Sequence, residues 1–161
     1  MKEGIYIIPV TEGTKDKPIV SWKEFMFRLP TEQEVTDWWT KYPTANIAMV
    51  TGSISGKFAL DTEKDFDPKN LPGEIKTRTS KTGSGGRHYL FNIPDGIKIP
   101  TLIEIWGKDP AVKADVKGER GYIVLPPSFN ADKNSNYEWL DESQEISDPP
   151  DWLLQLVNKL G

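Results

Sequence analysis

Three carboxylates stand where the surrounding sequence is apolar and typical of β-strands. Asp61 and Glu63 end the run FALDTE, and Asp115 interrupts the run ADVKG. Because residues i and i+2 of a strand point to the same face, Asp61 and Glu63 are expected on one side of a sheet. A carboxylate among apolar residues is costly unless it is paired or binds a metal. We therefore predict a three-carboxylate site for a divalent cation, which hard oxygen ligands suit.

Each of these carboxylates also has a simpler interpretation. An Asp-x-Glu pair occurs on many solvent-exposed strand faces, where it binds nothing. Asp115 is close to Lys113 and Lys117, so an ion pair with either lysine, or a cap on the turn before Gly118, would also explain it. The residue types and their spacing leave both interpretations open.

A second polar feature is the segment TGSGGRHYLF at residues 82–91, which places Gly85 and Gly86 before an apolar strand. Glycine weakens a strand unless another backbone or a ligand must approach closely. Successive glycine N–H groups can also form a nest that binds anions. Arg87 and His88, the only histidine of the chain, are adjacent. Adjacent strand residues face opposite sides, so only one of the two is expected to share a face with the carboxylates.

The chain has 161 residues, a net charge of −4 and no cysteine. This length suits one domain, and the lack of cysteine excludes disulfides, thiolate zinc sites and cysteine nucleophiles. An acidic segment at 61–67 precedes a basic one at 74–88, as a metal and a polyanion sharing one pocket would require. Two solvated loops of opposite charge would give the same pattern. The apolar run at 4–10 is too short for a signal peptide or a membrane helix, so we expect a cytoplasmic protein.

Hydrophobic patterning predicts a mixed α+β fold, with helices over a largely antiparallel or mixed sheet. Capping-box sequences begin helices at Ser21 and Thr31, and the last helix has Asp151 as its expected N-cap. Residues 74–80 are expected as an edge strand paired with 86–93 across the Gly-rich turn. Helices are expected within 21–27, 31–43 and 149–161, and further strands within 4–10, 45–52, 56–63, 101–107, 111–118, 121–128 and 136–141.

Taken in order, these features resemble the primase-polymerase (prim-pol) domain of the archaeo-eukaryotic primase superfamily. The first motif of that family, a strand ending in Asp-x-Asp/Glu, falls on Asp61 and Glu63, and the second falls on Ser84 through His88. The third motif, a hydrophobic residue followed by Asp, falls on Asp115. The resemblance runs through the segments IPV…KDKPIVSW (8–22), WWTKYPTANIAMVTGSISG (38–56), FALDTE (58–63), TGSGGRHYLF (82–91) and ADVKGERGYIVLPPS (114–128).

The resemblance implies an RRM-like catalytic core with a mixed sheet and helices, joined to a small N-terminal αβ unit. It implies a single catalytic domain over residues 1–161, the core of a longer protein. The implied ligands of catalytic Mg²⁺ or Mn²⁺ are Asp61, Glu63 and Asp115. The implied nucleotide-binding residues, in contact with the triphosphate or the template, are Ser84, Gly85, Gly86, Arg87, His88 and Lys117.

The same resemblance implies a metal-dependent nucleotidyltransferase, a DNA primase and DNA polymerase that makes primers from dNTPs or NTPs. Its partners would be a single-stranded DNA template, a primer and a helicase or accessory primase domain of the full-length protein, with no membrane. Two alternatives are a catalytically weak nucleic-acid-binding module of this fold and a carboxylate-metal nuclease. Three converging acids argue against a pure binding module, and the basic Gly-rich turn favours a polymerase over a nuclease.

Overall fold

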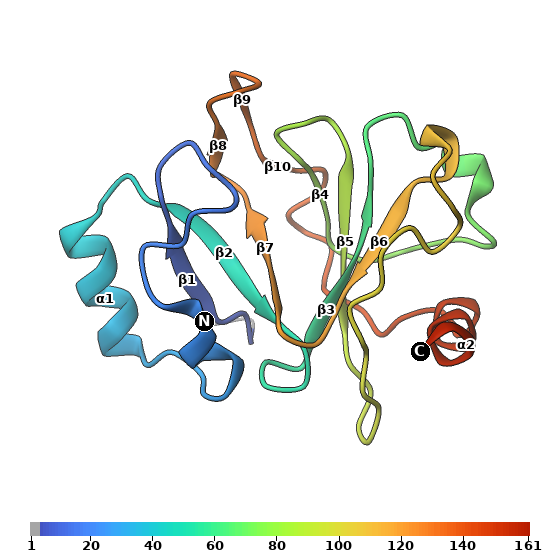
Figure 1. The fold of residues 1–161 in the computed structure, drawn as a ribbon, viewed down its shortest axis with the longest axis horizontal. Helices are drawn as coiled ribbons and strands as arrows, with labels where there is room; N and C mark the ends of the chain where they lie inside the picture. The colour runs from blue at the N-terminus through green and yellow to red at the C-terminus, as the bar shows by residue number, and fades with distance from the viewer. Residues whose placement is uncertain (1–3) are drawn as a thin grey trace.

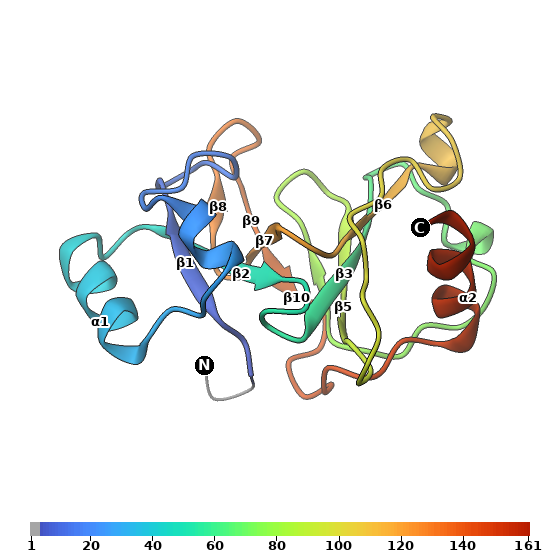
Figure 2. The same ribbon diagram turned by 60° about the horizontal axis from the view of Figure 1, so that its bottom comes forward.

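Two β-sheets packed face to face form the centre of the molecule, and one helix covers the outer side of each sheet (Figure 1). The structure is a computed structural model and describes residues 4–161. Helix α1 (Glu32–Lys41) lies beside the smaller sheet and helix α2 (Asp151–Leu160) beside the larger one, in both views (Figures 1 and 2). The predicted α+β class is confirmed.

The smaller sheet is antiparallel, with the order β1-β2-β7. Its strands are β1 (Ile7–Val10), β2 (Asn46–Thr51) and β7 (Gly121–Leu125). The predicted small αβ unit is therefore not purely N-terminal, because β7 comes from the second half of the chain.

Helical turns follow both of the capping-box sequences predicted near the N-terminus, but the hydrogen bonds of a capping box form only at Thr31. The Thr31 hydroxyl accepts a hydrogen bond from the Glu34 N–H, and the Glu34 carboxylate accepts one from the Thr31 N–H. These two bonds satisfy orphan donors and start α1 as predicted. Ser21 makes no such side-chain bond, and Trp22–Met26 forms a 3₁₀ helix, η1.

The larger sheet is also antiparallel, with the order β10-β4-β5-β3-β6. Its strands are β10 (Glu138–Trp139), β4 (Thr79–Lys81), β5 (Arg87–Asn92), β3 (Lys57–Thr62) and β6 (Ala114–Lys117). The remaining elements are η2 (Pro68–Asn70), η3 (Pro110–Val112), β8 (Phe129–Asn130) and β9 (Ser135–Asn136).

Three details of the strand and helix prediction were wrong. Only the end of the segment 74–80 is paired, and β10 covers its outer side, so β4 is not an edge strand. The segment 101–107 is an irregular strap along β6, because Glu104 adopts a positive φ of 49° that a regular strand excludes. The N-cap of α2 is Pro150, and Asp151 is the first helical residue.

Apolar residues fill all three layers between the elements, and the strand period of two decides which layer each residue joins. Phe58 and Leu60 of β3 pack in the cluster beneath α2, whereas Ala59 packs with Met49 and Ile123 between the two sheets. Residues of β1, β2, η1 and α1 form the third cluster. The inner face of β3 thus looks toward the smaller sheet. Within residues 4–161, no helix is long and apolar enough to cross a membrane.

Candidate active site

A row of polar residues crosses the larger sheet on the face that looks toward the smaller sheet. The strand register places Asp61 of β3 directly opposite His88 of β5 on one side and Asp115 of β6 on the other. Ser80 of β4 continues the row as the partner of His88. Residues directly opposite in an antiparallel pair have neighbouring side chains. The fold therefore brings together two of the three predicted carboxylates and the histidine.

Each carboxylate of the row has a basic neighbour. The Nε2 atom of His88 lies 3.3 Å from Oδ1 of Asp61, and Nζ of Lys117 lies 3.6 Å from Oδ2 of Asp115. The backbone N–H of Glu104 donates to Oδ1 of Asp115 over 2.8 Å. This bond comes from the left-handed residue of the irregular strap, so the departure from strand geometry holds the third carboxylate in place.

Two carboxylates directly opposite one another repel and destabilise the strand pairing, and nearby positive charge offsets this repulsion. Burial alone would raise the pKa of Asp61, but the interactions with His88, including its side-chain hydrogen bond, and the charges of Lys117 and Lys15 outweigh burial and lower that pKa. Asp61 is therefore ionised at neutral pH. Among residues 4–161, no three His, Asp or Glu side chains already stand in a metal-binding arrangement. The oxygen donors of Asp61 and Asp115 are nevertheless of the kind that Mg²⁺ and Mn²⁺ prefer.

A cavity of about 620 Å³ opens over this row, between the two sheets. Asp115 does not line it, and Glu63 is exposed one residue beyond the end of β3. The wall opposite the row includes Tyr122 and Val124 of β7 and Trp22 of η1. The predicted site residues that line the cavity are Asp61, Glu63, Ser84, His88 and Lys117.

The Gly-rich turn before β5 is shaped by the backbone of β3. A Cβ atom at Gly86 would collide with the carbonyl oxygen of Thr62, and Gly85 has a positive φ of 96°. The Gly86 N–H donates to the Thr82 hydroxyl and the Gly85 N–H to the Thr82 carbonyl. These two N–H groups are used inside the turn, so they do not form the predicted anion-binding nest. The group that approaches Gly86 closely is therefore the backbone at the end of β3.

Arg87 and His88 lie on opposite faces of the sheet at the start of β5, as the alternation of a strand predicts. His88 is buried beneath the cavity, whereas Arg87 is exposed and lies outside the cavity lining. Arg87 pairs in register with Thr62 and Lys81 at the rim of the sheet. Of the two residues, only the histidine shares a face with Asp61.

Comparison with known families connects this geometry to a function class. A sequence model of the family described as "Prim-Pol: Bifunctional DNA primase/polymerase, N-terminal" matches residues 1–152. The chain belongs to the Prim-Pol family. The match confirms the resemblance inferred from the motifs, and at the level of the family it implies primase- or polymerase-type nucleotidyl transfer on DNA and nucleotides. No curated protein matches the sequence.

The sequence analysis missed several residues that line the cavity of this Prim-Pol chain, among them Lys15, Arg120 and Tyr137. Lys15 lies in the segment KDKPIVSW, and Arg120 follows the third motif, so both stood in segments that carried the resemblance. Tyr137 had no sequence signal. Its ring lies 6.4 Å from that of His88 at an interplanar angle of 31°. Burial, and then the charge of Asp61, raises the pKa of Tyr137 to about 12, so its hydroxyl is protonated.

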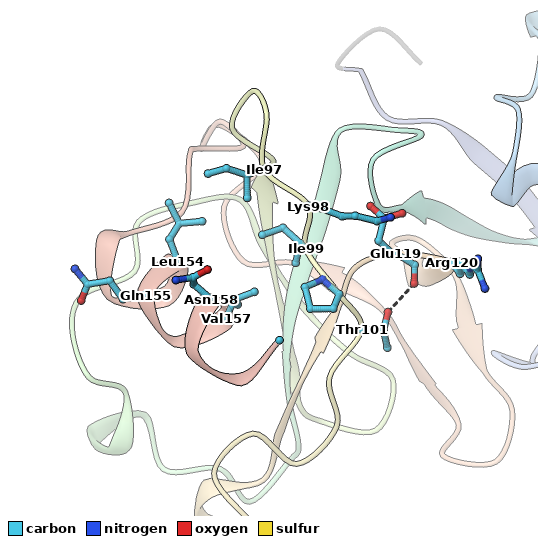
Figure 3. Close-up of a pocket in the computed structure, with 12 residues that line it drawn as sticks. Ile97, Lys98, Ile99, Thr101, Glu119, Arg120, Leu154, Gln155, Val157 and Asn158 are labelled. Atoms are coloured by element: carbon cyan, nitrogen blue, oxygen red, sulfur yellow. Dashed lines mark hydrogen bonds between the residues drawn. The ribbon is translucent and has the colours of Figure 1, made fainter.

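A second cavity of about 870 Å³ adjoins the first, between α2 and the segment 97–101 (Figure 3). Leu154 and Val157 of α2 line its apolar side, and Thr101, Glu119 and Arg120 line both cavities. Thr101 Oγ1 donates to the Glu119 carbonyl over 2.9 Å, which ties the strap to the β6–β7 connection (Figure 3). Arg120 has a positive φ of 58° at this junction. Arg120 therefore lies between the candidate active site of the Prim-Pol chain and the neighbouring cavity.

Proposed function

We propose that this chain is a metal-dependent nucleotidyltransferase that synthesises DNA or RNA primers on a single-stranded DNA template. The observation that carries the proposal is the row Asp115–Asp61–His88 across three strands, part of which forms the floor of a cavity between two sheets. Family membership supports the reaction class, and the row supports a site for that reaction between the two sheets.

The carboxylates fit a divalent cation. Asp61, Glu63 and Asp115 would hold Mg²⁺ or Mn²⁺, which supplies positive charge for the attacking oxygen and the leaving pyrophosphate when bound. The basic groups around Asp61 keep its carboxylate ionised, and so ready to bind a cation at neutral pH. The Glu104 N–H occupies Oδ1 of Asp115 and orients the remaining oxygen of that carboxylate.

The nucleotide would lie in the cavity over the row. Ser84, His88 and Lys117 offer a hydroxyl, a ring N–H and an ammonium group to a triphosphate, and all three line that cavity. Gly85 and Gly86 act by fixing the turn that presents Ser84. Arg87, outside the cavity, is then a contact of the template rather than of the triphosphate. Lys15 and Arg120 add positive charge at the cavity wall.

The remaining expectations belong to the same proposal. Residues 1–161 form one catalytic domain with an RRM-like larger sheet, and the site lies where the two sheets face each other. The net charge of −4 gives little non-specific attraction for DNA, because such attraction grows with the number of phosphates that basic residues neutralise. We therefore expect template binding to be strengthened by a helicase or accessory primase domain of a longer protein.

Primer extension tests the proposal. Wild type, Asp61→Asn and the control Asp37→Asn, an exposed acid on α1, are compared on a labelled primer-template with dNTPs and Mg²⁺ or Mn²⁺. We expect extension by wild type and control, and a loss of about a thousandfold in Asp61→Asn, since a ligand of the transition-state charge is removed. Metal-dependent cleavage of the DNA without dNTPs would indicate the nuclease. DNA binding without extension would indicate the binding module.

A further inference from the structure

Two buried polar atoms without a hydrogen-bond partner lie close to the candidate active site. In the described part of the chain, Oγ of Ser80 and Nδ1 of His88 are such atoms, and the third is Nε1 of Trp152, a residue of α2. Ser80 is fully buried, and 9% of the His88 side chain is exposed. A buried polar group without a partner costs free energy, so each of these atoms requires an explanation.

The two atoms belong to residues that face each other across two strands. Ser80 of β4 is the register partner of His88 of β5. Side chains of directly opposite residues have Cβ atoms about 5 Å apart and project from the same face of the sheet. The two atoms are not hydrogen-bonded to each other, so joining them requires a change of the Ser80 rotamer or a bridging water. The simplest partner of each orphan atom is therefore the other.

The opposite nitrogen of the ring determines the direction of this bond. Nε2 lies 3.3 Å from Oδ1 of Asp61, and an ionised carboxylate only accepts hydrogen bonds, so Nε2 carries the proton. In a neutral imidazole the second nitrogen is then an acceptor that needs a donor. A serine hydroxyl is such a donor. The ring of Tyr137 lies 6.4 Å from that of His88, and its hydroxyl makes no hydrogen bond to Nδ1.

We propose that Ser80 is a positioning residue for His88. Its hydroxyl donates to Nδ1, which holds the imidazole in the tautomer that directs Nε2–H toward Asp61 and the cavity. Ser80 does not line the cavity and is not part of any motif that the sequence analysis identified. The inference rests on the proposed function only for its kinetic consequence, because the tautomer can be measured without any reaction.

Nitrogen-15 NMR of the imidazole provides the test, because His88 is the only histidine of the chain and gives one unambiguous ring signal. Protein without a histidine tag is titrated until the ring shifts no longer change with pH. In wild type we expect the Nε2–H tautomer, with Nδ1 shifted as a hydrogen-bond acceptor. In Ser80→Ala the Nδ1 signal should move toward that of a free ring nitrogen, and the Nδ1–H tautomer should appear.

Thr79→Val is the matched control, because it removes a hydroxyl from the neighbouring residue of the same strand, where that hydroxyl donates to the Thr77 carbonyl. It should leave the His88 signal unchanged. If Ser80→Ala does not fold, Ser80→Cys, which keeps a weak donor, should give an intermediate Nδ1 shift. An Nδ1 signal that is the same in wild type and the Ser80 variant, or an Nδ1–H tautomer in wild type, would overturn the inference.

The kinetic consequence is measured separately. Ser80→Ala should lower the kcat of primer extension by about three- to tenfold with little change in KM. A decrease of this size corresponds to the net free energy of one hydrogen bond. Ser80→Thr, which retains the hydroxyl, should recover both the rate and the Nδ1 signal. If wild type performs no extension, the proposed function fails, while the NMR result still decides the role of Ser80.

Discussion

The two faces of the five-stranded sheet use the same three strands for opposite purposes. The face beneath α2 is apolar along most of β3, β5 and β6, with Thr62 and Arg87 at its rim, and it forms the largest buried cluster of the described chain. The face toward the smaller sheet is apolar in its middle, at Ala59 and Leu90, and polar at the end that bears the candidate site. There it carries Asp61, His88, Asp115 and Lys117.

This difference shows how a small sheet supports a polar site. The apolar face supplies the burial that stabilises strand pairing, and the strand period of two places every second residue on the other face. Like charges opposite one another on that face weaken the pairing of β3 with β6. The stability of one face therefore offsets the cost of the chemistry on the other, and substitutions on the two faces should have separable effects.

Leu60→Ala should produce the largest loss of stability. Leu60 is fully buried beneath α2 next to Asp61, so its truncation leaves a cavity and should cost about 2–5 kcal/mol in the free energy of unfolding. Urea denaturation measures this loss. The extension rate per folded molecule should stay at the wild-type value. Asp61→Asn should do the opposite: it should abolish most of the extension rate and shift the Tm by less than about 5 °C. A large loss of rate per folded molecule in Leu60→Ala would show that the two faces are coupled.

Gly86→Ala should be the next most disruptive change, because its Cβ would collide with the Thr62 carbonyl at the end of β3. We expect a loss of about 2 kcal/mol or more in the free energy of unfolding, since the turn or the strand must move. Gly96→Ala is the control, with nothing within 4 Å of its Cβ and a φ of 76°, and should cost only about 1 kcal/mol of backbone strain. Equal losses of stability in the two variants would mean that the turn moves away from the Thr62 carbonyl at no cost in free energy.

Glu104→Pro should lower activity without removing any side chain from the cavity. It deletes the N–H that holds Oδ1 of Asp115, a bond to a charged group, and it forces residue 104 out of its φ of 49°, because proline fixes φ at about −65°. Both changes release Asp115 and should slow extension by about tenfold or more. Glu104→Gly keeps the N–H and accommodates the positive φ, so it should retain activity. Thermal unfolding of both variants separates this effect from a loss of fold. Equal activity of the two variants would contradict the positioning of Asp115 by the strap.

The smallest expected effect is a dependence of stability on pH. The pKa of Asp61 in the folded state lies below its ordinary value of 3.8. A group of this kind adds stability that is complete above the unfolded pKa and is lost as the pH falls through the folded pKa. Between neutral pH and about pH 3, metal-free wild type should therefore lose more stability than Asp61→Asn. Parallel urea midpoints for the two proteins across this range would show that Asp61 gains nothing from its neighbours.

Much of the local structure could be predicted because its causes are local. The α+β class and most strands followed from hydrophobic patterning, and the Thr31–Glu34 capping box placed the start of α1. The strap at 101–107 and the pairing of β4 with β10 could not be predicted, because their hydrogen bonds depend on distant strands. Tyr137 was missed for the same reason, since only the fold brings its ring to His88.

The sequence by itself determined which residues carry chemistry: acids at the ends of apolar strands, one histidine after a Gly-rich turn, and motifs sufficient to recognise the family. Only the tertiary structure decided that Asp61 lies directly between His88 and Asp115, that Glu63 lies one residue beyond the end of β3, and that Arg87 lies outside the cavity. The physical reason is strand register. Register is set by pairing between distant segments and by turn geometry, and a slip of one residue would move every one of these side chains to the opposite face.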